Sequence, residues 1–155
     1  SLTGLIGERV VALAAATKAD AIAELAQYCA DGGIAQTAED VRQPIWEREQ
    51  LGSTGIGDGI AIPHCRIDGI AQTVVVCGVP RHPVDWEAPD RQPVALIFLI
   101  INPTRHPEQH LRAIRTISRA LQRHNFKTDF IHAAAHHETA AYLERLSAHM
   151  LPEMR

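Results

Sequence analysis

The sequence predicts an α/β fold, a three-layer sandwich in which helices flank both faces of a mixed β-sheet. Residues 73–79 and 94–101 are continuous apolar runs rich in valine and isoleucine, which is typical of central strands covered on both faces. Segments with apolar residues at helical spacing come before and after these runs. Since strands and helices alternate along the chain, we expect one sheet between two layers of helices.

The first strand and the first helix are expected near the start of the chain. Residues 9–13 form a short apolar run and predict the strand. Thr17 and Asp20 have the spacing of a capping box, in which side chains bond free backbone N–H groups at a helix start. The helix should end at the glycines of residues 32–33. Its buried face is expected to consist of Ile22, Leu25, Ala26 and Cys29.

A second helix is expected to begin at Thr37 and to end at Gly52. Pro44 lies inside this stretch and should kink the helix or shift its start, because proline lacks the N–H that an interior helix position donates. The apolar residues that should form its buried face are Val41, Ile45 and Trp46.

The C-terminal third is expected to be helical. Pro107 suits the first turn of a helix, where a missing N–H costs no hydrogen bond. A short helix near Thr128–Ala135 and a last helix near Glu138–Met150 should follow. The buried stripe of the helix at Pro107 is expected to consist of Leu111, Ile114, Ile117, Ser118 and Leu121.

The composition is that of one globular domain spanning residues 1–155. Hydrophobic residues make up 46% and charged residues 21% of the chain, so the core needs no disulfides. The net charge of −3 gives no basic footprint for nucleic acid. The longest apolar run, residues 94–101, is too short to cross a membrane, so direct membrane insertion is not expected.

Cysteine usage predicts a cytoplasmic setting. Cys29, Cys65 and Cys77 are odd in number and show no C-x-x-C spacing, which favours a reducing compartment. No basic segment followed by an apolar stretch indicates a secretory signal. The chain begins at Ser1 without methionine, which is compatible with a chain trimmed or cut from a longer protein.

A glycine-dense loop, residues 52–59, is the first candidate for a functional site. Its spacing does not fit a Rossmann fingerprint, and Gly57 is followed by Asp58 where a Walker A loop has lysine. A nucleotide site is therefore not expected. Glycines still let backbone N–H groups converge on a smaller anion, and a tight turn between helix and strand is the alternative.

His64 lies next to this loop, directly after Pro63. A neutral imidazole is a nucleophile near physiological pH, and it forms a labile phosphoramidate suited to onward transfer. One ring nitrogen would attack phosphorus, while the other has to be held as N–H by a neighbouring carbonyl or side chain. A structural or merely exposed histidine is the alternative, and the residue type alone does not decide between them.

The stretch from Arg48 to His64, REQLGSTGIGDGIAIPH, resembles an active-site signature almost residue for residue. The signature is that of the enzyme IIA family of the bacterial phosphotransferase system, in its fructose/mannitol and nitrogen-regulatory type. The likeness continues through residues 84–90, 93–100 and 110–111, and it covers nearly the whole chain. The resemblance implies a phosphocarrier with a mixed sheet and helices on both faces.

The resemblance also implies roles for individual side chains. The phosphoacceptor histidine of the family falls on His64, its active-site arginine on Arg48, and the second active-site histidine of the mannitol-type members on His110. Arg48 would supply positive charge to phosphate oxygens, and His110 would orient or hydrogen-bond the phosphate. Further phosphate-binding donors are expected at Ser53, Thr54 and Gly55.

Residue types alone leave alternatives for these assignments. Arg48 could instead pair with Glu47 or Glu49 on the helix surface, and residues 53–55 could simply form a turn. His110 could cap its helix or be partly buried.

Two residues depart from the family pattern. Cys65 follows the histidine where glycine is common. The alternatives for this residue are a redox-sensitive thiol and an ordinary packed thiol. Asp58 stands where the nitrogen branch often has asparagine, and its charge would make the pocket less favourable for a dianion.

Nine histidines require that a metal site be considered. His106 and His110, and His132 and His136, are four residues apart, the spacing at which helical side chains share a face. No cysteine and histidine cluster has zinc-type spacing. Neither a metal nor another cofactor is therefore expected.

The resemblance implies protein partners. The phosphoryl donor would be HPr or an HPr-like phosphocarrier protein. The acceptor would be a cysteine of a sugar-transporter IIB domain, or in the nitrogen branch a regulatory target protein would take its place. A docking surface around His64 is expected to include Ile56, Ile60 and Ile62, although these isoleucines could equally belong to the core.

The leading function is a phosphohistidine phosphocarrier of the phosphoenolpyruvate-dependent phosphotransferase system, which is a transferase component. One alternative is a regulatory binding module that docks on target proteins with an affinity switched by phosphorylation of His64. A second alternative is a degenerate domain that binds partners and is never phosphorylated.

Overall fold

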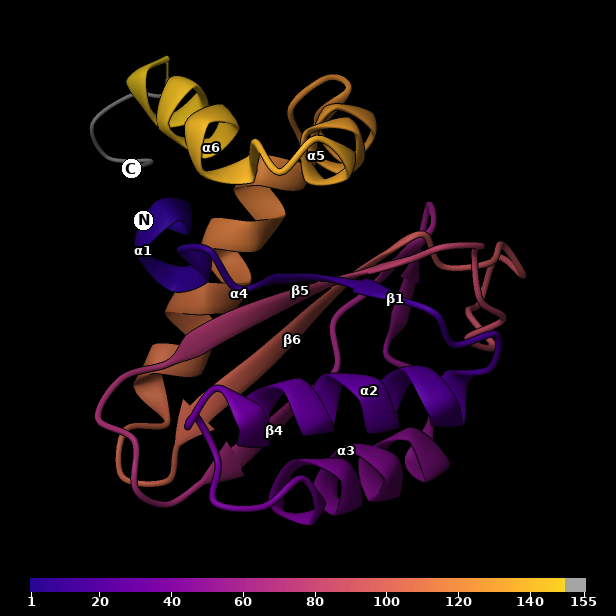
Figure 1. Ribbon diagram of the computed structural model, residues 1–155, viewed down its shortest axis with the longest axis vertical. Helices are drawn as coiled ribbons and strands as arrows, with labels where there is room; N and C mark the ends of the chain where they lie inside the picture. The colour runs from indigo at the N-terminus through magenta and orange to yellow at the C-terminus, as the bar shows by residue number, and fades with distance from the viewer. Residues whose placement is uncertain (150–155) are drawn as a thin grey trace.

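The computed structural model describes residues 1–149, which form a mixed sheet between two layers of helices (Figure 1). The strands are β1 (Val10–Leu13), β2 (Gly55–Gly57), β3 (Ile60–Ala61), β4 (His64–Ile67), β5 (Val74–Pro80) and β6 (Leu96–Pro103). The helices are α1 (Leu2–Ile6), α2 (Lys18–Asp31), α3 (Glu39–Leu51), α4 (Glu108–Leu121), α5 (Phe126–Ala135) and α6 (Thr139–Ala148). The three-layer α/β fold expected from the sequence is confirmed.

The strand order β1-β5-β6-β3-β2 places β5 and β6 at the centre of the sheet. β6 pairs antiparallel with β5 on one side, and on its other side it pairs parallel with both β3 and β4. Ile60 of β3 lies beside Leu96, and His64 of β4 lies beside Ile100, so both strands keep the same register against β6. β3 and β4 are therefore one line of chain, interrupted only at residues 62–63.

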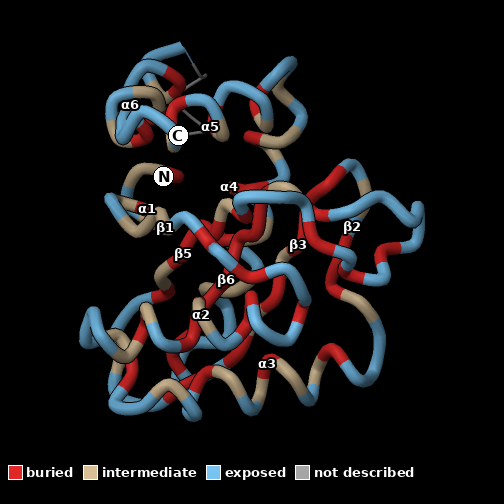
Figure 2. Tube along the Cα trace, turned by 45° about the vertical axis from the view of Figure 1, so that its right-hand side comes forward, coloured by how far each residue is buried: buried red, intermediate tan, exposed pale blue. Residues whose placement is uncertain are grey.

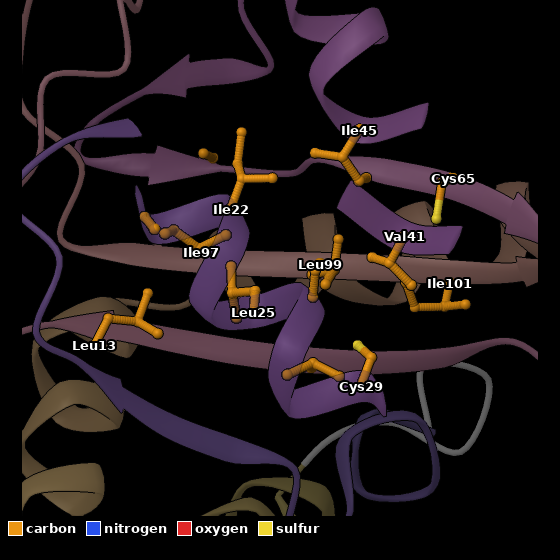
Figure 3. Packing of buried hydrophobic residues seen from close by; sticks show 14 of the residues in the cluster. Leu13, Ile22, Leu25, Cys29, Val41, Ile45, Cys65, Ile97, Leu99 and Ile101 are labelled. Atoms are coloured by element: carbon orange, nitrogen blue, oxygen red, sulfur yellow. The ribbon is translucent and has the colours of Figure 1, made fainter. Parts of the chain in front are cut away.

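Each face of the sheet buries its own hydrophobic cluster. Successive strand residues point to opposite faces, so β6 sends Ile97, Leu99 and Ile101 toward α2 and α3, as Figure 3 shows. The alternate residues Leu96, Phe98 and Ile100 pack with α1, α4, α5 and α6. All eight residues of β6 are consequently buried. In Figure 2 the central strands β5 and β6 run as mostly buried segments, while the outer helices expose much of their surface.

The predicted helix starts in the first half of the chain are largely confirmed. The side chain of Thr17 accepts the N–H of Asp20 at the start of α2, which ends before Gly32. Thr37 and Asp40 bond each other's backbone N–H groups, so they form a reciprocal capping box, and helical geometry begins at Glu39. α3 thus starts two residues later than expected, and Pro44 lies inside it.

The expected buried stripe of α4 is wrong for two residues. The buried residues are Ala113, Ile117 and Ala120, whereas Leu111 is 67% exposed and Ser118 is also exposed. At 3.6 residues per turn, Leu111 lies about 200° around the helix from Ala113. Small alanines face the sheet here, so residue size was a poor guide to the buried side.

The first helix was not expected from the sequence, whereas the last one was. α1 has five residues and was not expected, and its Leu2 and Ile6 are buried. The last helix ends at Ala148, and the expected end at Met150 lies outside the described residues. In the part of the chain that the structure describes, no helix has the length and apolar character needed to cross a bilayer.

Candidate active site

His64 is the first residue of β4, directly after the interruption at Pro63. The alternation of the strand turns its ring toward the α4 side of the sheet, opposite to Cys65. Its Nδ1 lies 3.2 Å from the carbonyl oxygen of Ile62. Because a carbonyl oxygen only accepts hydrogen bonds, Nδ1 carries the proton, and in the neutral ring Nε2 keeps its lone pair. The structure thus provides the carbonyl that the sequence argument required for a nucleophilic histidine.

His110 lies in the first turn of α4 and faces His64. The two ring centroids are 4.6 Å apart, with an angle of 43° between the planes. The pKa of His110 is lowered from its ordinary value, first because the ring is partly buried, then because His64 and Arg66 add positive charge nearby. His110 is therefore held in its neutral form near neutral pH. These two histidines, 46 residues apart in sequence, form the centre of the site.

Arg48 lies in the last turn of α3 and is half-buried. Its Nη1 donates a hydrogen bond of 2.8 Å to the carbonyl oxygen of Gly52, at the start of the glycine loop. Its guanidinium therefore sits where α3 meets the loop, and no ion pair joins it to Glu47 or Glu49 among the described contacts.

The glycine loop forms β2 and the tight turn into β3. Gly57, Asp58 and Gly59 all have positive φ values, of 95°, 55° and 77°. Aspartate and asparagine tolerate this left-handed conformation better than most residues, which explains the residue at position 58. Gly55 has a different reason, since a Cβ there would lie only 2.8 Å from the Cβ of Ala88.

The donors of residues 53–55 already have partners inside the protein. The Ser53 hydroxyl donates to the carbonyl oxygen of Trp86 at 2.6 Å, and the N–H of Gly55 donates to the Ser53 oxygen at 3.0 Å. The N–H and the hydroxyl of Thr54 both donate to the carboxylate of Glu49. The phosphate contacts expected for these three residues remain a prediction.

A buried ion pair, which was not expected from the sequence, lies beneath this loop. Lys18 Nζ is 2.5 Å from Glu49 Oε2, and the two side chains are 10% and 1% exposed. The Trp86 indole N–H lies 3.3 Å from Glu49 Oε1 and 3.1 Å from Thr54 Oγ1. We call Lys18, Glu49, Thr54 and Trp86 the loop-anchoring network. Glu49 shares the helical spacing of the buried Val41 and Ile45, which was the available signal.

The three cysteines are packed, free thiols. Burial raises the pKa of Cys65 to about 12 and that of Cys29 to about 11. Burial also raises the pKa of Cys77. A thiol in this state is a poor nucleophile at neutral pH, which favours the packed-thiol alternative for Cys65.

Within residues 1–149, no three histidine, cysteine, aspartate or glutamate side chains are grouped so that they could hold a metal ion. His132 and His136 do lie close, with ring centroids 4.5 Å apart, but on α5 and its end rather than at the site. Of the three isoleucines expected on a docking surface, Ile56 is 51% exposed, Ile62 is half-buried, and Ile60 belongs to the core.

Comparison with known proteins agrees with this fold. Residues 6–146 match the family described as the phosphoenolpyruvate-dependent sugar phosphotransferase system, EIIA 2. The chain therefore belongs to this family, whose members take part in phosphoryl transfer or its regulation.

Relatives come from both branches of the family. A nitrogen regulatory protein of Pseudomonas aeruginosa is 41% identical over 86 residues, which cover 56% of this chain and 56% of that protein. A fructose-specific EIIA component of Haloferax volcanii is 30% identical over 76% of this chain and 77% of its own length. The chain is thus matched over little more than half of the Pseudomonas relative.

Solved structures show the same fold. The nitrogen regulatory protein IIA-Ntr of Neisseria meningitidis is 28% identical with a TM-score of 0.74, covering 84% of this chain and 91% of that one. The IIA mannitol structure of Escherichia coli is 26% identical with a TM-score of 0.62, covering 76% of this chain and 82% of that one.

Proposed function

We propose that this protein is a phosphohistidine phosphocarrier whose His64 accepts a phosphoryl group from HPr or an HPr-like protein. It would pass the group to a sugar-transporter IIB domain or keep it as a regulatory signal. The observation that carries the proposal is the contact of 3.2 Å between His64 Nδ1 and the Ile62 carbonyl oxygen, which leaves Nε2 as the nucleophile. Membership of a phosphotransferase family supports it.

The proposed step is a phosphoryl exchange between two imidazoles. The lone pair of His64 Nε2 forms a bond to phosphorus, the bond between phosphorus and the donor nitrogen breaks, and its electron pair returns to the donor ring. Positive charge develops on the His64 ring as the new bond forms. The carbonyl oxygen of Ile62 is already placed at Nδ1–H, so it stabilises that charge without rearrangement.

The phosphoryl oxygens need positive charge and hydrogen-bond donors. His110, whose ring centroid is 4.6 Å from that of His64, would donate to one of these oxygens. Arg48 would exchange its bond to the Gly52 carbonyl for bonds to phosphate, as a guanidinium binds a dianion with a planar fork. Ser53, Thr54 and Gly55 would also have to exchange existing bonds, so we assign them a smaller share.

The partners would dock on the exposed surface beside the two histidines. Leu111 directly follows His110 and is 67% exposed, and Ile56 of the glycine loop is 51% exposed. Large apolar side chains at the rim of a charged site suit a transient protein contact. Such a carrier would work in the cytoplasm, with residues 1–155 as one EIIA-like domain.

The test is labelling of the purified chain with phosphoenolpyruvate, enzyme I and HPr, read by intact mass at neutral pH. A gain of about 80 Da that is lost in acid is expected for a phosphohistidine. His64→Ala should show no gain. His132→Ala, which removes an exposed histidine on α5, is the matched control and should label like the wild type. Full labelling of His64→Ala would overturn the assignment.

The nitrogen-type alternative is a docking module whose target affinity is switched by the same phosphorylation. One relative is named nitrogen regulatory protein, which supports this alternative. Labelling with an HPr-like donor but not with HPr would select this alternative. Absence of labelling with both donors would contradict the carrier and favour a module that is never phosphorylated.

A further inference from the structure

We infer that Asn102 is a positioning residue that, together with Thr73, fixes the single proton of neutral His110 on Nε2, where it can meet a phosphoryl group on His64. The inference deepens the proposed function and rests on it. Neither Asn102 nor Thr73 was expected as a site residue from the sequence.

Asn102 is an exception within its strand. It is only 2% exposed and lies in β6, where all eight residues are buried and the side chains before it are apolar. A buried amide without hydrogen bonds is costly, and both of its polar atoms are bonded here. Its Oδ1 is 3.0 Å from Thr73 Oγ1, and its Nδ2 is 2.9 Å from His110 Nδ1. The amide therefore connects the start of β5 to the first turn of α4.

The direction of these hydrogen bonds determines the form of His110. The Thr73 hydroxyl donates to Asn102 Oδ1, and the amide nitrogen Nδ2 faces the ring. An amide nitrogen only donates, so His110 Nδ1 has to accept and cannot carry a proton. In a neutral imidazole the single proton is then on Nε2.

Thr73 also holds the helix that carries His110. Its backbone N–H donates a hydrogen bond of 2.8 Å to the side-chain oxygen of Gln109. The same residue thus orients the amide of Asn102 and ties down the first turn of α4. We call Thr73, Asn102 and His110 the histidine-orienting network.

The two histidines consequently have opposite forms. The contact with the Ile62 carbonyl oxygen keeps the proton of His64 on Nδ1, so the ring offers a lone pair at Nε2. His110 offers an N–H at Nε2, because its Nδ1 accepts from Asn102. One ring can attack phosphorus while the other donates to a phosphoryl oxygen. The lowered pKa of His110, due first to burial, supports the neutral form that this arrangement needs.

Nitrogen-15 NMR of the imidazole rings in the unphosphorylated full chain tests the inference directly. We expect the wild-type His110 to show the pattern of a proton fixed on Nε2. In Asn102→Leu the pattern should move toward a mixture of both forms, because Nδ1 loses its donor. In Asn102→Asp the carboxylate only accepts, so Nδ1 should become protonated. A wild-type His110 with its proton on Nδ1, or the same pattern in all three proteins, would overturn the inference.

Transfer rates provide a second measurement. Asn102→Leu should still label to full stoichiometry but more slowly, by about 10- to 100-fold, the loss seen when a histidine in a metal site loses its orienting partner. Thr73→Val, which lacks the hydroxyl, should also be slower, whereas Thr73→Ser should approach the wild-type rate. If Asn102→Leu fails to fold, the rates of Thr73→Val and Thr73→Ser still test whether this hydrogen-bond network orients His110. Wild-type rates in both Asn102→Leu and Thr73→Val would contradict the role.

The two proposals can fail separately. If the wild type is not labelled by HPr or by an HPr-like donor, the carrier function fails. The NMR pattern of His110 still shows whether Asn102 fixes its proton. If the wild type labels normally and the NMR pattern is the same in every variant, the carrier stands and the role of Asn102 fails.

Discussion

The two polar networks on opposite faces of the sheet differ in charge and in reach. The loop-anchoring network, on the α2 and α3 side, contains the ion pair of Lys18 and Glu49 and holds the glycine loop from below. The histidine-orienting network, on the α4 side, is neutral and ends at a ring of the site. Both connect segments that are distant in sequence. One network fixes where the loop runs, and the other fixes where a proton lies.

Because of this difference, the two networks should respond differently to substitution. A buried ion pair is expensive to break, because the remaining buried charge loses the opposite charge that compensated it. A neutral buried amide that loses one partner leaves one polar atom unsatisfied, which costs about 1–3 kcal/mol. Substitutions below the loop should therefore act mainly on folding, whereas substitutions near His110 should act mainly on chemistry.

The largest effect is expected for Glu49→Gln. It leaves the ammonium of Lys18 buried without its carboxylate, which should lower the free energy of unfolding by about 3–5 kcal/mol, measured by chemical denaturation. The double variant Lys18→Met with Glu49→Leu removes both charges and should recover most of the loss. Thr73→Val is the comparison on the other face, and it should cost about 1–3 kcal/mol because it leaves Asn102 Oδ1 buried without its donor. Equal losses for Glu49→Gln and Thr73→Val would break the comparison.

A smaller effect is expected in the pH titration of His110. Its pKa is lowered from the ordinary value of 6.5, by burial first and then by the charges of His64 and Arg66. Arg66→Gln removes one of these charges, so the pKa of His110 should rise toward 6.5 in an NMR titration. Arg105→Gln removes an exposed arginine that is not among these causes, and it serves as the control. A fall after Arg66→Gln would contradict the electrostatic account.

The same titration has a consequence for stability. The folded pKa of His110 lies below the unfolded value, so the unfolded chain binds the proton more readily. The contribution of His110 to stability is therefore complete above pH 6.5, and it is lost as the pH falls from there through the lowered pKa of the folded state.

The smallest effect is expected for the thiols, which take no part in either network. Burial raises the pKa of Cys65 to about 12, so the native protein should show almost no alkylation by iodoacetamide at neutral pH. After unfolding, all three free cysteines should react. Rapid alkylation of the native chain at Cys65 would instead support the redox-sensitive alternative.

Much of the fold was predictable because its signals are local. The apolar runs of β5 and β6 and the cap at Thr17 depend on residues close in sequence. The short strands β2, β3 and β4 have two to four residues each, and β2 contains two glycines, so they show no periodicity that could reveal them. β3 and β4 form because β6 offers an edge on which they can pair, and β2 in turn pairs with β3.

The site was predictable in part. The resemblance implied His64, His110 and Arg48, and the structure brings the two histidines together. Lys18 meets Glu49 only because α2 packs against α3. Thr73, the partner of Asn102, is 29 residues away in sequence and directly precedes β5. No spacing rule connects such pairs. Contacts that orient a site through tertiary packing are therefore visible only in the folded chain.

The pairing of β3 and β4 has a consequence for protein synthesis. Both strands precede β6 by about thirty residues or more of chain and pair with it on the same side. A ribosome that has released the chain only as far as residue 95 has exposed His64 but not the strand that holds it. Asn102 belongs to that strand, and His110 comes later still. A nascent chain should therefore be unable to carry phosphate until its C-terminal half emerges, because domains generally fold as units.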